Sequence, residues 1–272
     1  MYGFILKKNF CDVWDNLLTV IIVNLVHMLS ASGILYLWAL LTKSLGANTL
    51  DIVSIATTCG FITLWNIIHY IITFAFGEQA VKICNFEGIR IRDFFLSIPG
   101  CIVDAIKYGI FISLLLFLSI FLLYFYWFSG SKIGIFVFGI IFWIDIFLIL
   151  SLQWFCALRC TMHNNFRKCL RKCFIIFFDN TGFSILVALN NLVLFIFSVL
   201  FVGLIPSIGA MVINNQNNLR IRLYKYDYLE EHPELNNKKD RKKIPWEELI
   251  YDDRETLGPR KFKSFLFPWK EN

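Results

Sequence analysis

Several apolar stretches of the sequence are interrupted by side chains that can carry protons or coordinate ligands. These residues are Asp145, Asn24, His27, Asn66, His69, Asn190 and Asn191. Asn24 and His27 are three residues apart, which places them on one face of a helix. Inside a membrane such groups could relay protons or bind a substrate. The alternative, which we favour, is that they form interhelical hydrogen bonds, which average only ~0.6 kcal/mol there.

Cysteine pairs with a spacing of four residues occur twice, at Cys156 and Cys160 and again at Cys169 and Cys173, with His163 between the pairs. Thiolate and imidazole groups can bind zinc, but this spacing differs from the C-x2-C spacing of ordinary zinc sites. We therefore predict no metal and no cofactor, and expect the thiols to pack as small core residues. Most of the cysteines lie in apolar or reducing surroundings, so a disulfide framework is not expected.

The sequence contains no G-x-S-x-G, H-E-x-x-H, Walker A or G-x-G-x-x-G pattern. A paired-aspartate protease would need a second carboxylate at the depth of Asp145, whereas Asp104 and Asp179 lie near the ends of apolar stretches. We therefore predict that the protein is not an enzyme.

The elements that carry these residues are predicted to be membrane-spanning helices. Of the 272 residues, 57% are hydrophobic and 17% are charged, whereas soluble domains carry roughly 25% charged residues. A helix crosses a bilayer with ~20 apolar residues. Runs of that length occupy residues 16–41, 52–76, 108–128, 133–158 and 181–202. The predicted fold is an all-α polytopic transmembrane helix bundle.

The distribution of Lys and Arg predicts the orientation of the bundle. Lys7 and Lys8 precede the first run, and further basic residues lie between the second and third runs and between the fourth and fifth, which predicts a cytoplasmic N-terminus. The C-terminal tail is also basic. We therefore predict about six spans, with a short or broken sixth near residues 201–221 that includes the polar run 214–218. Both termini are then cytoplasmic, and the expected location is the cell inner membrane.

The predicted organisation is a membrane body over residues 1–222 and a charged cytoplasmic tail over residues 223–272. Within the body, residues 78–98, with a turn at Glu87–Gly88, and residues 163–178 look amphipathic. The tail divides into a helix that continues to Glu231, a polar linker over 232–243 and an aromatic terminal segment over 244–272.

Basic and aromatic residues of these segments could contact the membrane surface or a partner. These are Arg167, Lys168, Arg171, Lys172, Phe265, Phe267 and Trp269. For the basic residues we favour a positive anchor at the lipid surface over a docking helix. For the aromatic residues we favour folding back onto the protein, with a partner's groove as the alternative. Expected partners are lipids and other proteins. The tail is too mixed in charge to predict nucleic-acid binding.

The order of several short motifs resembles the YesL-like family of bacterial membrane proteins, a family of unknown function. These motifs are Glu87–Gly88, Asp93–Phe95, Ala105–Lys107 and the run Trp154–Arg159 before a basic helix. The resemblance covers residues 10–222 and implies an accessory role beside carbohydrate ABC transporters. The sequence departs from the family around residues 45–58 and in the tail, whose ending resembles that of uncharacterised spirochaete membrane proteins.

Two functions are therefore left open. We favour a non-catalytic accessory or scaffold protein of a membrane transport complex, which should tolerate Asp145→Asn. The alternative is a small transporter or channel in which Asp145, His27 and Asn190 line a path, and which the same substitution should inactivate.

Overall fold

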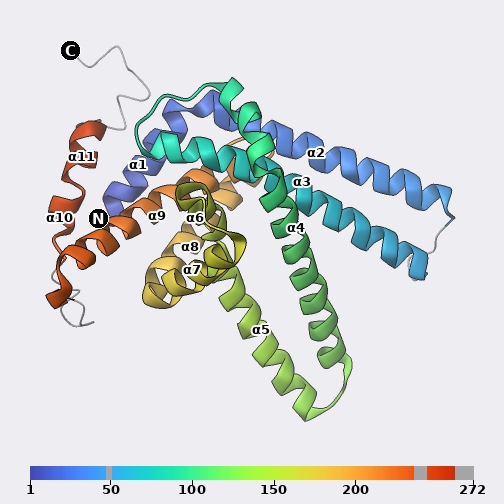
Figure 1. The fold of residues 1–272 in the computed structure, drawn as a ribbon. Helices are drawn as coiled ribbons and strands as arrows, with labels where there is room; N and C mark the ends of the chain where they lie inside the picture. The colour runs from blue at the N-terminus through green and yellow to red at the C-terminus, as the bar shows by residue number, and fades with distance from the viewer. Residues whose placement is uncertain (47–50, 236–243, 261–272) are drawn as a thin grey trace.

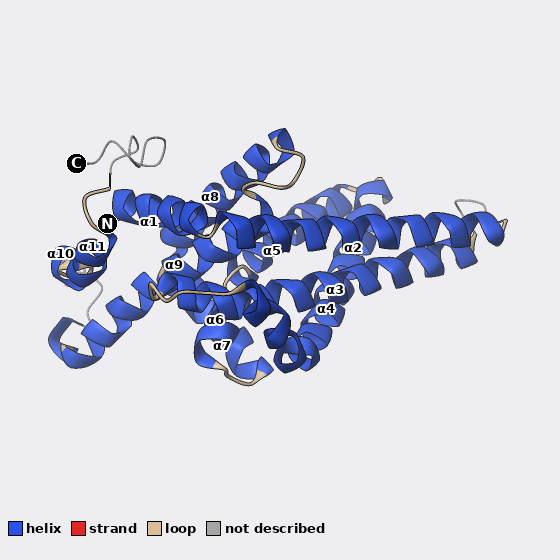
Figure 2. Cartoon of the chain, turned by 90° about the horizontal axis from the view of Figure 1, so that it is seen from above, coloured by secondary structure: helices blue, strands red, loops and turns tan. Residues whose placement is uncertain are grey.

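The computed structural model describes residues 1–46, 51–235 and 244–260. Throughout these residues the regular structure is helical, without strands (Figure 2). The predicted all-α fold is confirmed.

Within the described ranges, five helical segments are long and apolar enough to cross a membrane. They are α2 (Leu17–Ser44), α3 (Ile52–Cys84), α4 (Ile91–Phe128), α5 (Lys132–Leu152) continued by α6 (Phe155–Met162), and α8 (Thr181–Leu200). Each corresponds to a predicted span, as expected of a multi-pass membrane protein. α4 begins 17 residues earlier than predicted, at Ile91 instead of Tyr108. The extension contains Asp104, which is stabilised by an ion pair with Arg159 of α6.

The long helices leave a common body as arms that point in different directions (Figure 1). We call α2 with the first half of α3 the first arm, and α5 with the second half of α4 the second arm. The other halves of α3 and α4 pack side by side in the body. They meet closely where Gly109 of α4 faces the backbone of Ile67, and the Asn66 Nδ2 donates to the Ser113 Oγ over 2.9 Å. Beyond this contact the arms separate.

The body is built around α9 (Ser207–Glu231), which corrects the prediction of a short or broken sixth span. The break lies earlier, in the turn at residues 201–206, and α9 itself is a continuous helix of 25 residues. Helix α9 is not among the helices apolar enough to span a membrane. Asn214 is nevertheless fully buried, because the amide side chains of α9 find partners on neighbouring helices.

Helix α9 runs antiparallel to α8. Asn190 bonds to Asn214, Asn191 bonds to Asn215, and Asn180, just before α8, bonds to Tyr226. The chain therefore returns along α8 to the body through α9, and the returning helix is polar.

The predicted amphipathic segments belong to different kinds of element. Residues 78–98 are not one helix, because they include the end of α3, a connection at residues 85–90 and the start of α4. The turn itself lies at Asn85–Phe86, and Glu87–Gly88 follow it in the connection to α4. Residues 163–178 mostly form α7 (Phe166–Asp179), which buries Cys169 and Cys173 against the body.

The described part of the tail packs against the body. Helix α9 passes through residue 222 without a break and ends at Glu231, the predicted end of the first part of the tail. After a 3-10 turn (Pro233–Leu235), the described chain resumes at Ile244 and forms α10 (Trp246–Leu249) and α11 (Tyr251–Leu257) beside the N-terminus (Figure 2). Phe265, Phe267, Trp269 and most of the predicted linker lie outside the described residues.

Candidate functional site

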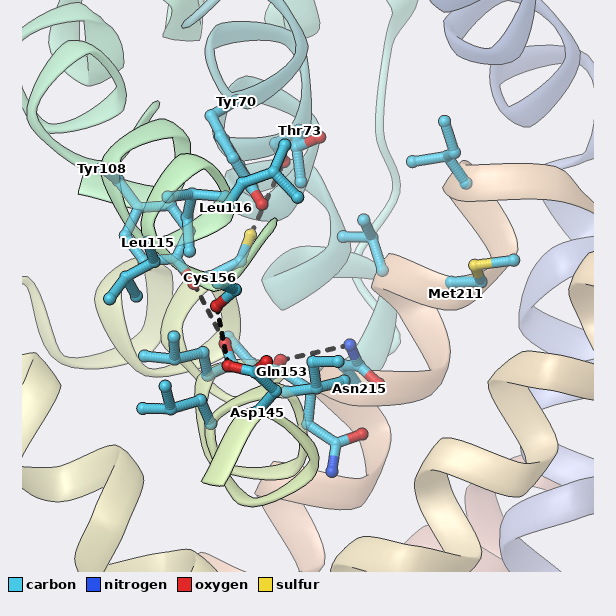
Figure 3. A pocket seen from close by; sticks show the side chains of 18 of the residues that line it. Tyr70, Thr73, Tyr108, Leu115, Leu116, Asp145, Gln153, Cys156, Met211 and Asn215 are labelled. Carbon is cyan, nitrogen blue, oxygen red and sulfur yellow. Dashed lines mark hydrogen bonds between the residues drawn. The ribbon is translucent and has the colours of Figure 1, made fainter. Parts of the chain in front are cut away.

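Asp145 lies in a cavity between the second arm and the body (Figure 3). Its Oδ1 atom accepts a hydrogen bond from the Ser119 Oγ of α4 over 2.7 Å. The cavity has a volume of about 580 Å³, and apolar side chains, mainly leucine and isoleucine, form most of its wall. A carboxylate thus faces an apolar space that is large enough for a small molecule.

Other polar groups line the same cavity nearer to the body. The Asn215 Nδ2 donates to the Gln153 backbone oxygen over 3.3 Å, and the Cys156 thiol contacts the Thr73 carbonyl oxygen at 3.7 Å. Figure 3 shows these side chains and Tyr70 around the cavity. Sequence reasoning missed Ser119 and Gln153 as lining residues, because single polar residues in apolar helices are common and only the packing shows what they face.

His27 and His69 are brought together between α2 and α3. Their ring centroids are 5.0 Å apart. The His27 Nδ1 lies 3.0 Å from the Val23 carbonyl oxygen, and its Nε2 lies 3.4 Å from the Thr73 Oγ1. The contact with Thr73 joins the first arm to the body.

Asn24 and Asn66 each stabilise a separate helix contact. The Asn24 Nδ2 donates to the backbone oxygens of Leu204 and Pro206, and its Oδ1 accepts from the Gly209 backbone N–H. Asn24 therefore holds the turn before α9, whereas Asn66 joins α3 to α4. The predicted Asp, His and Asn residues thus lie at several helix contacts, and two of these contacts reach the cavity of Asp145, because Thr73, which His27 contacts, and Asn215, which Asn191 bonds, both line it.

Asn190 and Asn191 belong to a cluster of amides centred on Asn214. The Asn214 Oδ1 accepts from Asn9, Asn190 and Asn218, and its Nδ2 donates to Asn191. We call this set, together with Asn217 and Asp12, the amide cluster. The sequence indicated the polar run of α9, but it did not show that α1 (Tyr2–Asp15) supplies partners for that run.

The Asp12 carboxylate of the amide cluster is buried on α1 and pairs with Lys8. The Asn217 Nδ2 donates to the Asp12 Oδ2 over 2.7 Å, and the Lys8 Nζ lies 3.1 Å from the same oxygen. Burial raises the pKa of Asp12 above its ordinary value of 3.8, while Lys8 and the Asn217 hydrogen bond oppose this shift.

A second buried charge was missed by sequence reasoning. Arg159 is only 9% exposed. It pairs with Glu78 of α3 and with Asp104 of α4, where the Nε to Oδ2 distance is 3.0 Å. In the sequence, Arg159 was a basic residue after the fourth apolar run and the end of the motif Trp154–Arg159, with no partner indicated. The structure makes it a link between α3, α4 and α6.

The cysteine pairs line helix contacts. Cys156 and Cys160 pack against Gly77, where a Cβ atom would lie 2.6 Å from the Cys160 Sγ. Among the described residues, no group of three or more His, Cys, Asp or Glu side chains is placed to hold a metal ion.

The basic residues of α7 form an exposed face. Arg167, Lys168 and Arg171 are exposed, while Lys172 is half-buried and its Nζ contacts the Met162 sulfur. We call the exposed three the basic face.

Comparisons with models of known families, with curated proteins and with solved structures give no match for this chain.

Proposed function

We propose that the chain is a non-catalytic accessory or scaffold protein of the cell inner membrane, with both termini on the cytoplasmic side. The observation that carries this proposal is the basic face of α7. Its three cations are exposed, whereas Arg159 and Lys225 in the same body are buried and paired with carboxylates. Exposed cations on a helix whose other face is buried can bind anionic lipid or an acidic partner.

The path of the chain supports the proposed orientation. The body contains α1 and the described part of the tail, and α9 returns to it along α8. Lys43 and Lys132 lie near the tips of the arms, whereas the other basic residues that the structure describes lie in the body. By the positive-inside rule the body faces the cytoplasm.

The hydrogen bonds made by the polar side chains of the arms support a structural role for these residues. His27, Asn24 and Asn66 each make contacts that join two helices, at separate places in the fold. Interhelical hydrogen bonds of this kind stabilise membrane bundles without forming a continuous polar path. The resemblance to the YesL-like family supports a transport complex, of the carbohydrate ABC type, as the partner.

The test is purification of the tagged full chain from its native host in mild detergent, with identification of co-purifying proteins. The variant is Arg167→Glu with Arg171→Glu, which reverses the charge of the basic face. A matched control is Arg90→Glu with Arg92→Glu, because both residues are exposed in the turn before α4 and at its start. We expect a membrane partner to accompany the wild type and the control but not the variant.

Other outcomes would contradict the proposal. A solitary protein in all three preparations would argue against an accessory role. If the α7 variant still co-purifies with the partner, the basic face does not contribute to binding of that partner. A fluorescent protein fused after Asn272 tests orientation separately, because fluorescence is expected only if the C-terminus is cytoplasmic.

A further inference from the structure

The cavity that contains Asp145 is formed by segments far apart in the sequence. Its wall includes residues of α3, α4, α5, α6 and α9 (Figure 3). A volume of about 580 Å³ lies within the ~300–1,000 Å³ typical of small-molecule sites. All of these residues except Gln153, which lies in the turn between α5 and α6, belong to regular helices.

The wall is apolar around a single acid. Leu116, Leu148 and Ile112 are among the residues that contribute apolar surface. Of the described residues that line the cavity, Asp145 is the only one with a carboxyl group, and none is Lys, Arg or His. The Ser119 hydroxyl donates one hydrogen bond to Asp145 but brings no positive charge. A cation in the cavity would therefore complement the carboxylate.

The depth of Asp145 restricts the kind of cation. On α5, Lys132 lies 13 residues before it, which corresponds to ~20 Å of helix rise, and Gln153 lies eight residues after it, or ~12 Å. The carboxylate therefore lies within the apolar part of the span. Phospholipid head groups stay at the membrane surface, so they would not reach it. A ligand for this site must carry its charge inside an apolar body.

We propose that this cavity binds a lipophilic organic cation, whose positive charge pairs with Asp145 and whose apolar groups contact the leucine and isoleucine wall. This inference goes beyond the accessory role and does not depend on it. The charge of Asp145 provides selectivity for cations over neutral molecules of the same shape, whereas the apolar wall contributes affinity for both.

The test uses the purified full chain in phosphatidylcholine nanodiscs and tritiated tetraphenylphosphonium as the probe. Empty nanodiscs give the background from partition into lipid. Equilibrium dialysis measures the saturable binding that remains, and triphenylphosphine oxide serves as a neutral competitor. We expect saturable binding of about one cation per chain and little displacement by the neutral compound.

Variants then separate the roles of charge and volume. Asp145→Asn keeps the shape of the side chain and is expected to weaken binding about tenfold or more, as for the loss of an ion pair away from water. Asp145→Glu should retain binding. Leu148→Trp, which fills the cavity, should abolish it. Glu255→Gln, at an exposed position of α11, is the matched control for the removal of one carboxylate.

Three results would overturn the proposal. The first is the absence of saturable binding to the wild type. The second is affinity of a folded Asp145→Asn variant within about twofold of the wild type, which would assign the cavity to an acyl chain. The third is displacement of tetraphenylphosphonium by the neutral competitor as effectively as by unlabelled cation. This result would show that the cavity does not select for charge, even if the Asp145→Asn variant does not fold. Circular dichroism and size-exclusion chromatography check folding.

Discussion

Gly109 of α4 lies so close to Ile67 of α3 that a Cβ atom on Gly109 would be 2.8 Å from the Ile67 Cα. Only glycine allows the two backbones to approach to this distance, as small residues do at many membrane helix contacts. Because the arms separate just beyond this contact, it determines where the first and second arms diverge.

Substitution of Gly109 should therefore destabilise the fold. We expect Gly109→Ala to lower the free energy of unfolding by about 1–3 kcal/mol, since the backbone of Ile67 has to move. Gly139→Ala on α5 is the control, because a Cβ atom there has no neighbour within 4 Å. Thermal unfolding in detergent measures both. Equal unfolding temperatures for the two variants would refute the close-approach argument.

Asn214 is expected to contribute more stability than an amide with a single partner. Asn214→Leu would leave the side chains of Asn9, Asn190 and Asn191 without hydrogen bonds that they now form with it. Each buried group without a partner costs about 1–3 kcal/mol, so the variant should lose several kcal/mol or fail to fold. Asn66→Leu, which removes one bond to Ser113, is the comparison. The prediction is wrong if both variants unfold at the same denaturant concentration.

Asp12 should make stability depend on pH. Burial raises its pKa in the folded protein above the ordinary 3.8, so the folded state binds the proton more tightly than the unfolded chain. The resulting contribution to stability is fully present below pH 3.8 and is lost as the pH rises through the raised pKa. Asp12→Asn should reduce this loss, which a series of unfolding temperatures from about pH 4 to 8 would detect.

A neighbouring carboxylate provides the control for this experiment. Asp15 lies on the same helix and pairs with Arg260 at the surface, where such pairs contribute only about 0–1 kcal/mol. Asp15→Asn should keep the pH profile of the wild type. Identical profiles for Asp12→Asn and the wild type would exclude Asp12 as the source of the pH dependence.

The packing of α10 and α11 against the body should depend on contacts with α9. Arg220 pairs with the buried Asp253 of α11 over 2.7 Å, and the Arg222 guanidinium lies 3.5 Å from the Phe183 ring centre and 5.1 Å from that of Trp246. Burial lowers the pKa of Arg222 to about 10. We expect Trp246→Ala to weaken the packing of α10 and α11 by about 1–2 kcal/mol.

Hydrogen exchange can measure this packing directly. The amides of residues 250–257 should exchange several-fold faster in Trp246→Ala than in the wild type, because one kcal/mol of lost packing changes an opening equilibrium about fivefold. Tyr251→Ala is a suitable control, since Tyr251 is 61% exposed. Unchanged exchange in Trp246→Ala would mean that the aromatic contact does not hold this segment.

The amino-acid sequence by itself determined the all-α class and the positions of the apolar spans. Long uncharged runs cannot be solvated as helices in water, and their length matches a bilayer. The same local rule failed for α9. The prediction of a short or broken helix rested on the shortness of the apolar stretch before residue 215 and on Pro206 and Gly209, whereas Pro206 precedes the helix and Gly209 lies inside it without a break.

Only the tertiary structure decided which polar groups meet. Asn9 lies 205 residues from Asn214 in the sequence, and Arg159 lies 81 residues from Glu78. Apolar periodicity reports which residues avoid water, but hydrogen bonds and ion pairs depend on distances between helices that are far apart in the chain. The cavity around Asp145 also depends on the arrangement of distant helices. The position of Asp145 in α5 was evident from the sequence, whereas the space that it faces arises from the way α4 and α5 leave the body.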